Sequence, residues 1–317
     1  MLITLSDAEY HARKELSNSK LSAFLASRRD YHREHILGLP RGRKDCFAFG
    51  GLLHAMLLDP ADLDGRYRVM PTRADRGQED GGKPDARMYL RSAADKAYFA
   101  EWEAECEAAG IEMVRPEDAA LALPMVEALA KHEQLAEYLR HPKAMREQTI
   151  LWTHEDTGRA MRSKLDLVIP SLRVVVDLKS AAKKPGRLSV DAMNDANRRD
   201  WTGYGYHRQA ACYLQAAYEA FGENFAYVLG FIEKSEDPTV SAVQLDVDSL
   251  SVIHGAEEVT DGIRALQACE ESDDWREPCE VGVQRHEILP AWKINQLAFE
   301  SGQGAVEGAT EVDGDGR

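Results

Sequence analysis

The sequence is poor in cysteine and has no long apolar run. Its five cysteines are far apart: Cys46, Cys106, Cys212, Cys269 and Cys279. An odd, scattered set does not form a disulfide framework, and the absence of a Cys-x-x-Cys pair argues against a zinc motif. No run approaches the ~18 apolar residues of a membrane span, and the first residues lack a secretory apolar stretch. We therefore expect a cytoplasmic protein with reduced thiols and no membrane partner.

Positive charge is also scarce. Lys and Arg number 39 against 54 Asp and Glu, which gives a formal net charge of −15. This balance argues against a general nucleic-acid coat protein with a basic surface. It is compatible with a protein that contacts DNA only inside one basic groove. The 317 residues, of which 44% are hydrophobic, are sufficient for a large globular core.

The order of predicted elements indicates an α/β core with helical additions. Capping and periodicity predict helices over 16–37, 47–60, 85–109 and 116–140. Strands 149–154, 160–169 and 172–178 follow as a meander. The remaining predicted elements are a helix over 203–222, strands over 225–233 and 239–247, and helices over 249–268 and 292–299.

This order favours one domain over residues 1–300. Its helical N-terminal part covers about 1–145, its core about 146–250, and its C-terminal helices about 250–300. Residues 71–84 are expected to form an exposed loop, and the acidic, Gly-rich tail 301–317 to be disordered.

The meander carries the strongest chemical signal. Asp166 lies in its second strand, and Asp177-Leu178-Lys179 ends its third. Because side chains alternate along a strand, Asp177 and Lys179 share one face while Leu178 points into the core. Two carboxylates beside an ammonium suit a hard divalent cation such as Mg²⁺, which prefers oxygen ligands. The alternative is a surface Asp–Lys pair, but Asp177 follows a buried-looking Val-Val-Val run.

Four further positions are candidates with ordinary structural alternatives. Gln209 and Tyr213 are four residues apart on one helix face, where Gln209 can bind a phosphate or the attacking water. The alternative is that Gln209 is exposed and Tyr213 only packs. His54 lies in an apolar helix and could be a satisfied core residue. Glu147, just before the first predicted strand, could be solvated.

Five segments in this order resemble the PD-(D/E)XK nuclease superfamily, and more closely its RecE-type (exonuclease VIII) prophage branch, which is related to the RecB-like nucleases. They are LSNSKLSAF, FGGLLHAMLLDP, RSKLDLVIP, VVVDLKSA and YHRQAACYLQAAY, between about residues 16 and 220. The resemblance implies a PD-(D/E)XK nuclease core, which is a mixed central sheet flanked by helices, with helical N-terminal additions.

The resemblance also implies roles for single residues. His54, Asp166, Asp177 and the Leu178 backbone carbonyl would be metal ligands, with Glu147 as a further candidate. Lys179 would be the catalytic lysine, and Gln209 and Tyr213 the Q-x-x-x-Y element. Relatives often carry Gly-Arg just upstream of the first Asp, where this sequence has Leu165. Arg162 could supply that positive charge from a shifted position.

Basic clusters bracket the proposed site in sequence and are candidates for a groove that follows the DNA backbone. The candidate DNA contacts are Arg28, Arg29, Arg43, Arg162, Lys183, Lys184, Arg198, Arg199 and the aromatic Tyr206. A solvated charged face, or a packed Tyr206, is the alternative.

The implied activity is a Mg²⁺-dependent exonuclease, in which Mn²⁺ can substitute. It would digest linear double-stranded DNA from the 5′ end and leave a 3′ strand for a single-strand annealing protein, and it would act as a homo-oligomeric ring. An iron–sulfur cluster is not expected, because Cys269 and Cys279 are followed by no third cysteine whereas such a cluster needs four thiolates. The alternatives are an endonuclease or single-strand nuclease on the same fold, a DNA-binding protein that has lost activity, and an unrelated α/β protein.

Overall fold

The structure, a computed structural model, describes residues 1–39, 45–72, 92–181 and 205–281. The chain divides into two compact units, Met1–Asp274 and Trp275–Arg317. Within its described residues the second unit holds the short helix α12 (Pro278–Val281). All other elements among the described residues belong to the first unit.

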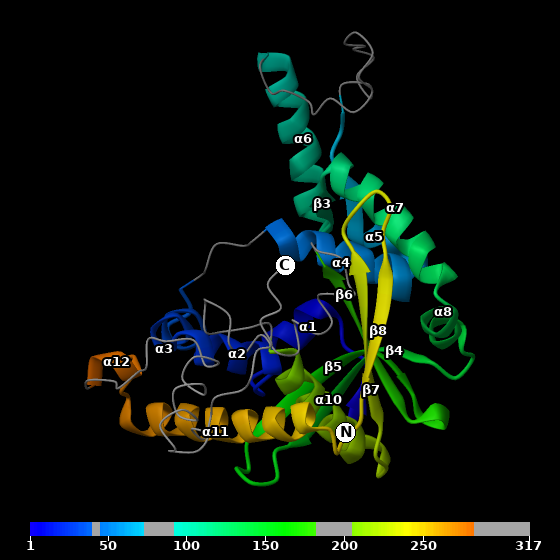
Figure 1. Ribbon diagram of the computed structural model, residues 1–317. Helices are drawn as coiled ribbons and strands as arrows, with labels where there is room; N and C mark the ends of the chain where they lie inside the picture. The colour runs from blue at the N-terminus through cyan, green and yellow to red at the C-terminus, as the bar shows by residue number, and fades with distance from the viewer. Residues whose placement is uncertain (40–44, 73–91, 182–204, 282–317) are drawn as a thin grey trace, which may run out of the picture. The chain divides into compact units, whose positions relative to one another are not determined.

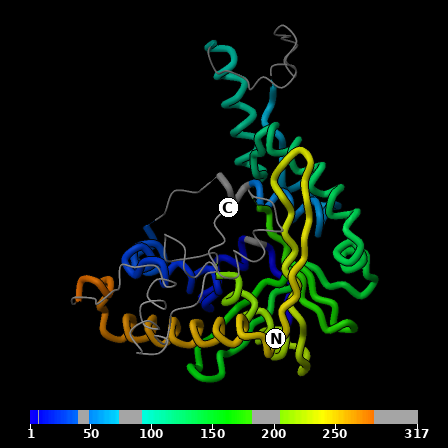
Figure 2. The backbone as a smooth tube through the Cα atoms, viewed as in Figure 1, coloured from blue at the N-terminus to red at the C-terminus, as the bar shows by residue number. Residues whose placement is uncertain are grey.

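The first unit is built on a mixed six-stranded sheet with the strand order β1-β4-β5-β6-β7-β8 (Figure 1). These strands are β1 (Leu2–Ile3), β4 (Met145–Thr153), β5 (Ala160–Ile169), β6 (Val174–Ala181), β7 (Ala226–Glu233) and β8 (Val240–Leu245). Strands β4, β5 and β6 form the predicted antiparallel meander. Strand β7 is parallel to β6 and forms an antiparallel hairpin with β8, drawn in yellow-green to yellow in Figure 2.

Helices pack on both faces of this sheet, so the predicted α/β fold with a mixed central sheet is confirmed. The N-terminal helical elements are α1 (Asp7–Ala12), α2 (Asn18–Ala26), α3 (Arg28–Tyr31), a π-helical turn (His32–Ile36), α4 (Asp45–Leu58), a 3₁₀ turn (Pro60–Asp62) and α5 (Leu63–Arg66). They are followed by α6 (Ala93–Ala109), α7 (Pro116–Lys131), α8 (Glu133–Arg140), a 3₁₀ turn (Pro170–Leu172), α10 (Tyr206–Phe221) and α11 (Leu250–Ser272). A separate parallel pair joins β2 (Tyr67–Val69) to β3 (Glu112–Val114).

Strand periodicity decides which side chains enter the core. Val174, Val176 and Leu178 of β6 pack with α4, α7 and α8 in one apolar cluster. The intervening side chains, Asp177 and Lys179 among them, therefore lie on the opposite face of the sheet, which α10 covers. Helix α11 packs on α10 and forms an outer layer (Figure 1).

The predicted long helices are divided where side chains cap new helices. The segment 16–37 breaks at Ser27, which is extended and accepts a hydrogen bond from the N–H of Asp30. The segment 116–140 breaks at His132, whose Nδ1 accepts a hydrogen bond from the N–H of Leu135. Both residues thus supply the side-chain acceptor that a helix N-terminus needs.

Several short pairings were not predicted, and some predicted segments lie outside the described residues. Strand β4 begins at Met145 and so includes Glu147, and β1, β2 and β3 were not among the predicted strands. The predicted helix 292–299, the tail 301–317 and most of the loop 71–84 lie outside the described residues. Within the described residues, no helix combines the length and apolarity needed to cross a membrane.

The close approach of α10 and α11 gives a stability prediction. A Cβ added at Gly255 in α11 would lie 2.4 Å from the carbonyl oxygen of His207 in α10, whereas a Cβ at Gly50 in α4 would meet nothing within 4 Å. We expect Gly255→Ala to lower the free energy of unfolding by ~1–3 kcal/mol, because backbone atoms must separate. The matched change Gly50→Ala should raise it by up to ~1 kcal/mol through helix propensity. Urea unfolding measures both, and an unchanged or increased stability of Gly255→Ala would contradict the observed packing.

Candidate metal and catalytic site

The two predicted carboxylates lie where β5 and β6 separate. The strands pair at Ile169 with Val174, Val168 with Val175 and Leu167 with Val176, and the ladder then ends. Asp166 and Asp177 occupy the next facing positions. Strand β6 continues beside β7 as far as Ala181. The main chain of β6 beyond this fork therefore needs partners other than β5.

Side chains supply those partners at the peptide groups of Leu178. The N–H of Leu178 donates to Oδ2 of Asp166 at 2.9 Å, and Nε2 of His54, from α4, lies 2.9 Å from the Leu178 carbonyl oxygen. Because a carbonyl only accepts, Nε2 of His54 donates in this bond. Nδ1 of His54 then faces Oδ1 of Asp166 at 3.7 Å. Three of the predicted metal-binding groups thus meet at one place.

Asp177 lies deeper and has both oxygens engaged. Its side chain is 1% exposed, Oδ2 lies 2.6 Å from Nζ of Lys179, and Oδ1 accepts a hydrogen bond of 2.9 Å from Nε2 of Gln209. Burial alone would lower the pKa of Lys179, but the carboxylates of Asp177 and Asp166 outweigh it and raise that pKa above its ordinary value. Lys179 is therefore a permanent cation at neutral pH and is suited to stabilise negative charge rather than to accept a proton.

Glu147 completes a group of metal-binding donors. It faces Asp166 across β4 and β5, since its neighbours Arg146 and Gln148 pair with Leu167 and Leu165. Its φ of +51° is rare for a residue with a side chain, and such strain accumulates at functional sites. One ligand atom each from His54, Glu147 and Asp166 lies within 4.8 Å of the others.

These donors line a pocket of about 490 Å³. Burial raises the pKa of Asp166 to about 6, with His54 opposing this rise and Asp177 adding to it. Tyr213 also lines the pocket, and burial followed by the charge of Asp177 raises its pKa well above 10. The carboxylates of Glu147 and Asp166 and the His54 imidazole fit a cation such as Mg²⁺ or Mn²⁺, with the Leu178 carbonyl as an additional oxygen.

The sequence missed several residues of the pocket. Lys164 lies two positions before Asp166 on the same strand face and forms an ion pair with Glu147, so strand alternation could have identified it. Arg66, Tyr67 and Tyr10 also line the pocket. They come from elements distant in sequence, and no spacing connects them to Asp166.

The prediction that Arg162 contacts DNA is wrong. Its side chain is among the largest that are fully buried, and the residue is 1% exposed. Its Nη1 donates to the carbonyl oxygens of Arg13 and Glu15 at 2.5 and 2.6 Å, and its guanidinium lies 4.7 Å from the centre of the Tyr10 ring. Arg162 therefore ties the N-terminal segment to β5. The prediction failed because the sequence shows that Arg162 is charged but not that it is buried.

The other candidate DNA contacts have varied positions. The ring of Tyr206 lies beside the site, with its centre 5.9 Å from Nζ of Lys179. In α3, Arg28 lies over the ring of Phe24 at 5.7 Å, and Arg29 is exposed. The remaining candidates lie outside the described residues: Arg43, Lys183, Lys184, Arg198 and Arg199.

Comparison with known proteins agrees with this architecture. Residues 17–283 match the family described as "PDDEXK-like domain of unknown function (DUF3799)". Among solved structures, the chain is similar to a protein of Eubacterium rectale that is provisionally named an exonuclease. Identity is 13%, the TM-score is 0.56, and the alignment covers 90% of this chain and 97% of that chain. At this identity the likeness is one of fold.

A second structure, named SSO0001, aligns over 67% of this chain and 81% of that chain at 14% identity. Its TM-score of 0.27 is too low to support an argument. No curated protein matches the chain in a sequence comparison.

The buried Asp166 gives a prediction for stability against pH. The pKa of Asp166 is 3.8 in the unfolded chain and about 6 in the folded chain, so between these pH values the folded chain keeps a proton that the unfolded chain has lost. The contribution of Asp166 to the free energy of unfolding therefore falls as the pH rises through this range. Asp166→Asn should therefore raise the free energy of unfolding by ~1–3 kcal/mol at about pH 7.5 in chelator. The gain should largely disappear by about pH 4, which urea unfolding at both pH values measures. A variant destabilised equally at both would show that Asp166 mainly supports structure.

Proposed function

Because this chain belongs to the PDDEXK-like family, we propose that it is a metal-dependent nuclease that hydrolyses phosphodiester bonds of DNA. One observation carries the proposal. Asp166, Glu147 and His54 converge at a strand fork, with the cation Lys179 ion-paired to Asp177 beside them. A phosphodiester needs positive charge where negative charge develops, and this pocket concentrates both a cation site and a fixed ammonium.

The residues of the pocket have different proposed roles. His54, Glu147 and Asp166 would hold Mg²⁺ together with the Leu178 carbonyl. Asp177 would become a further ligand when it releases its present contacts with Lys179 and Gln209. When bound, the cation supplies positive charge to the phosphate and activates a water molecule. Lys179 donates hydrogen bonds to the attacking water or to a phosphate oxygen. Asp177 positions Lys179, and Gln209 positions Asp177.

We further propose an exonuclease that digests linear double-stranded DNA from the 5′ end and leaves 3′ single strands for recombination. The support is the resemblance of the five sequence segments to RecE-type nucleases. The same resemblance supports a homo-oligomeric ring and a single-strand annealing protein as partner. Light scattering of the purified chain tests the oligomer, because a monomer at working concentration would contradict the ring.

The decisive experiment uses duplex DNA in linear and covalently closed circular form, labelled separately at 5′ and 3′ ends. With Mg²⁺ or Mn²⁺ we expect loss of the 5′ label from linear DNA only, and none with chelator. Lys179→Ala should lower the rate ~10²–10³-fold, because loss of one pre-positioned donor to a developing anion has this effect. Lys131→Ala, at an exposed position at the end of α7, is the matched control and should keep the full rate.

Each other result contradicts a stated part of the proposal. Cutting of the circle would indicate an endonuclease, and early loss of the 3′ label would reverse the polarity. Digestion of single-stranded DNA alone would show that the substrate is single-stranded rather than duplex DNA. DNA binding without cleavage under either metal would indicate a protein that has kept the fold and lost the activity.

A further inference from the structure

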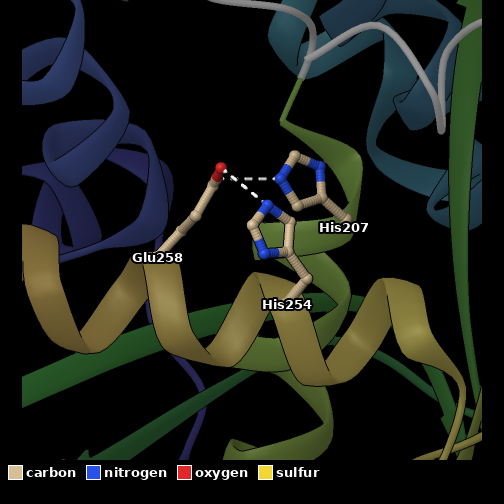
Figure 3. Close-up of side chains that lie close together, drawn as sticks. All are labelled: His207, His254 and Glu258. Carbon is tan, nitrogen blue, oxygen red and sulfur yellow. Dashed lines mark hydrogen bonds and ion pairs between the residues drawn. The ribbon is translucent and has the colours of Figure 1, made fainter. Parts of the chain in front are cut away.

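A second group of metal-binding side chains lies outside the pocket, between α10 and α11 (Figure 3). His207 comes from the first turn of α10, and His254 and Glu258 lie one helical turn apart on α11. Nε2 of His207 is 2.9 Å from Oε2 of Glu258, and Nε2 of His254 is 3.2 Å from Oε1 of the same carboxylate. Both imidazoles therefore direct a nitrogen toward one carboxylate.

The surrounding backbone holds these donors in place. Gly255, next to His254, allows α11 to approach the carbonyl of His207 so closely that a Cβ there would lie 2.4 Å away. The two imidazole rings are nearly parallel, with an interplanar angle of 7° and centroids 5.9 Å apart. Donors fixed in this way lose little conformational entropy when they bind an ion.

Exposure differs across the group in a way that suits ion binding. His207 is 4% exposed, whereas the side chains of Glu258 and His254 are 29% and 59% exposed. The site is thus anchored on its inner side and open to solvent on its outer side. One ligand atom from each residue lies within 4.8 Å of the others.

We propose that His207, His254 and Glu258 form a binding site for a transition-metal cation of the Zn²⁺ type. Two imidazoles and one carboxylate are a donor set used by zinc sites, in which a fourth position remains for water. Imidazole nitrogen favours zinc and its neighbours over Mg²⁺, which prefers oxygen. This site therefore differs in ion preference from the pocket, and the inference is independent of the proposed nuclease activity.

Arg208 contacts the carboxylate of this site. Its Nη1 lies 2.6 Å from Oε2 of Glu258, the oxygen that also meets His207. The guanidinium of Arg208 favours the charged form of the Glu258 carboxylate. Arg208 can therefore keep one oxygen while Oε1, on the His254 side, remains for the ion. Its positive charge also weakens cation binding, which predicts a moderate rather than a very tight site.

The position of the site gives an ion there a structural effect. His207 is flanked by Tyr206, whose ring lies near Lys179, and by Gln209 two residues on, which donates to Asp177. An ion bound to His207, His254 and Glu258 would fix this first turn of α10 to α11. We therefore expect the ion to stabilise the fold as well as to bind.

The test is Zn²⁺ titration by calorimetry of the full chain carrying Asp166→Asn, which removes one donor of the pocket. Adding His254→Ala should remove one bound ion or weaken its binding by more than the ~10–100-fold that loss of an outer partner costs. His254 is exposed, so this change should not impair folding. The matched control is Glu257→Gln on the same turn, which removes a charge 3.7 Å from His254 but no donor of the site.

Thermal unfolding provides a second readout. Zn²⁺ should raise the Tm of the Asp166→Asn chain and of its Glu257→Gln derivative, but not that of the His254→Ala derivative, because an ion that binds only the folded state stabilises it. Equal numbers of bound ions, equal affinity and equal Tm shifts with and without His254→Ala would overturn the proposal. Loss of both effects in the Glu257→Gln control would also overturn it, because general charge attraction would then explain the binding.

Discussion

The hydrogen bonds at Leu178 are the contacts on which the site depends. Its side chain packs in the core with α4, α7 and α8, while its N–H and C=O point to the gap that opens where β5 leaves β6. Asp166 accepts from the N–H and His54 contacts the C=O, so β5 and α4 are both attached to one residue of β6. A buried main chain without partners is costly, and here polar side chains that also suit a metal ion satisfy it.

The neighbouring buried charges also have polar partners. Asp177 is almost fully buried, yet Lys179 forms an ion pair with one of its oxygens and Gln209 donates to the other, and Lys164 lies against Glu147. Helix α10 serves two sides, since Gln209 faces Asp177 while His207 meets Glu258 of α11. An acidic protein with a net charge of −15 thus places Arg66, Lys164 and Lys179 beside the carboxylates of one pocket, where these cations would suit the phosphate of the proposed substrate.

Much of this arrangement follows from periodicity. Strand β5 runs over the predicted residues Ala160–Ile169, and alternation places Asp177 and Lys179 on one face. Periodicity does not show where a ladder ends, so the fork that brings Asp166 to Leu178 could not be predicted. Nor could the positive φ of Glu147, which depends on tertiary contacts. Arg162 was misassigned because a charged side chain with backbone acceptors can be buried.

The central claim is that the pocket binds a divalent cation between His54, Glu147 and Asp166. Paramagnetic resonance of Mn²⁺ tests this most directly, since it counts free ions without requiring catalysis. We predict that the chain binds a Mn²⁺ ion that Mg²⁺ displaces, and that Glu147→Gln weakens this binding while Glu133→Gln, at an exposed position in α8, does not. Equal binding by all three proteins, or none by the unaltered chain, would contradict the account.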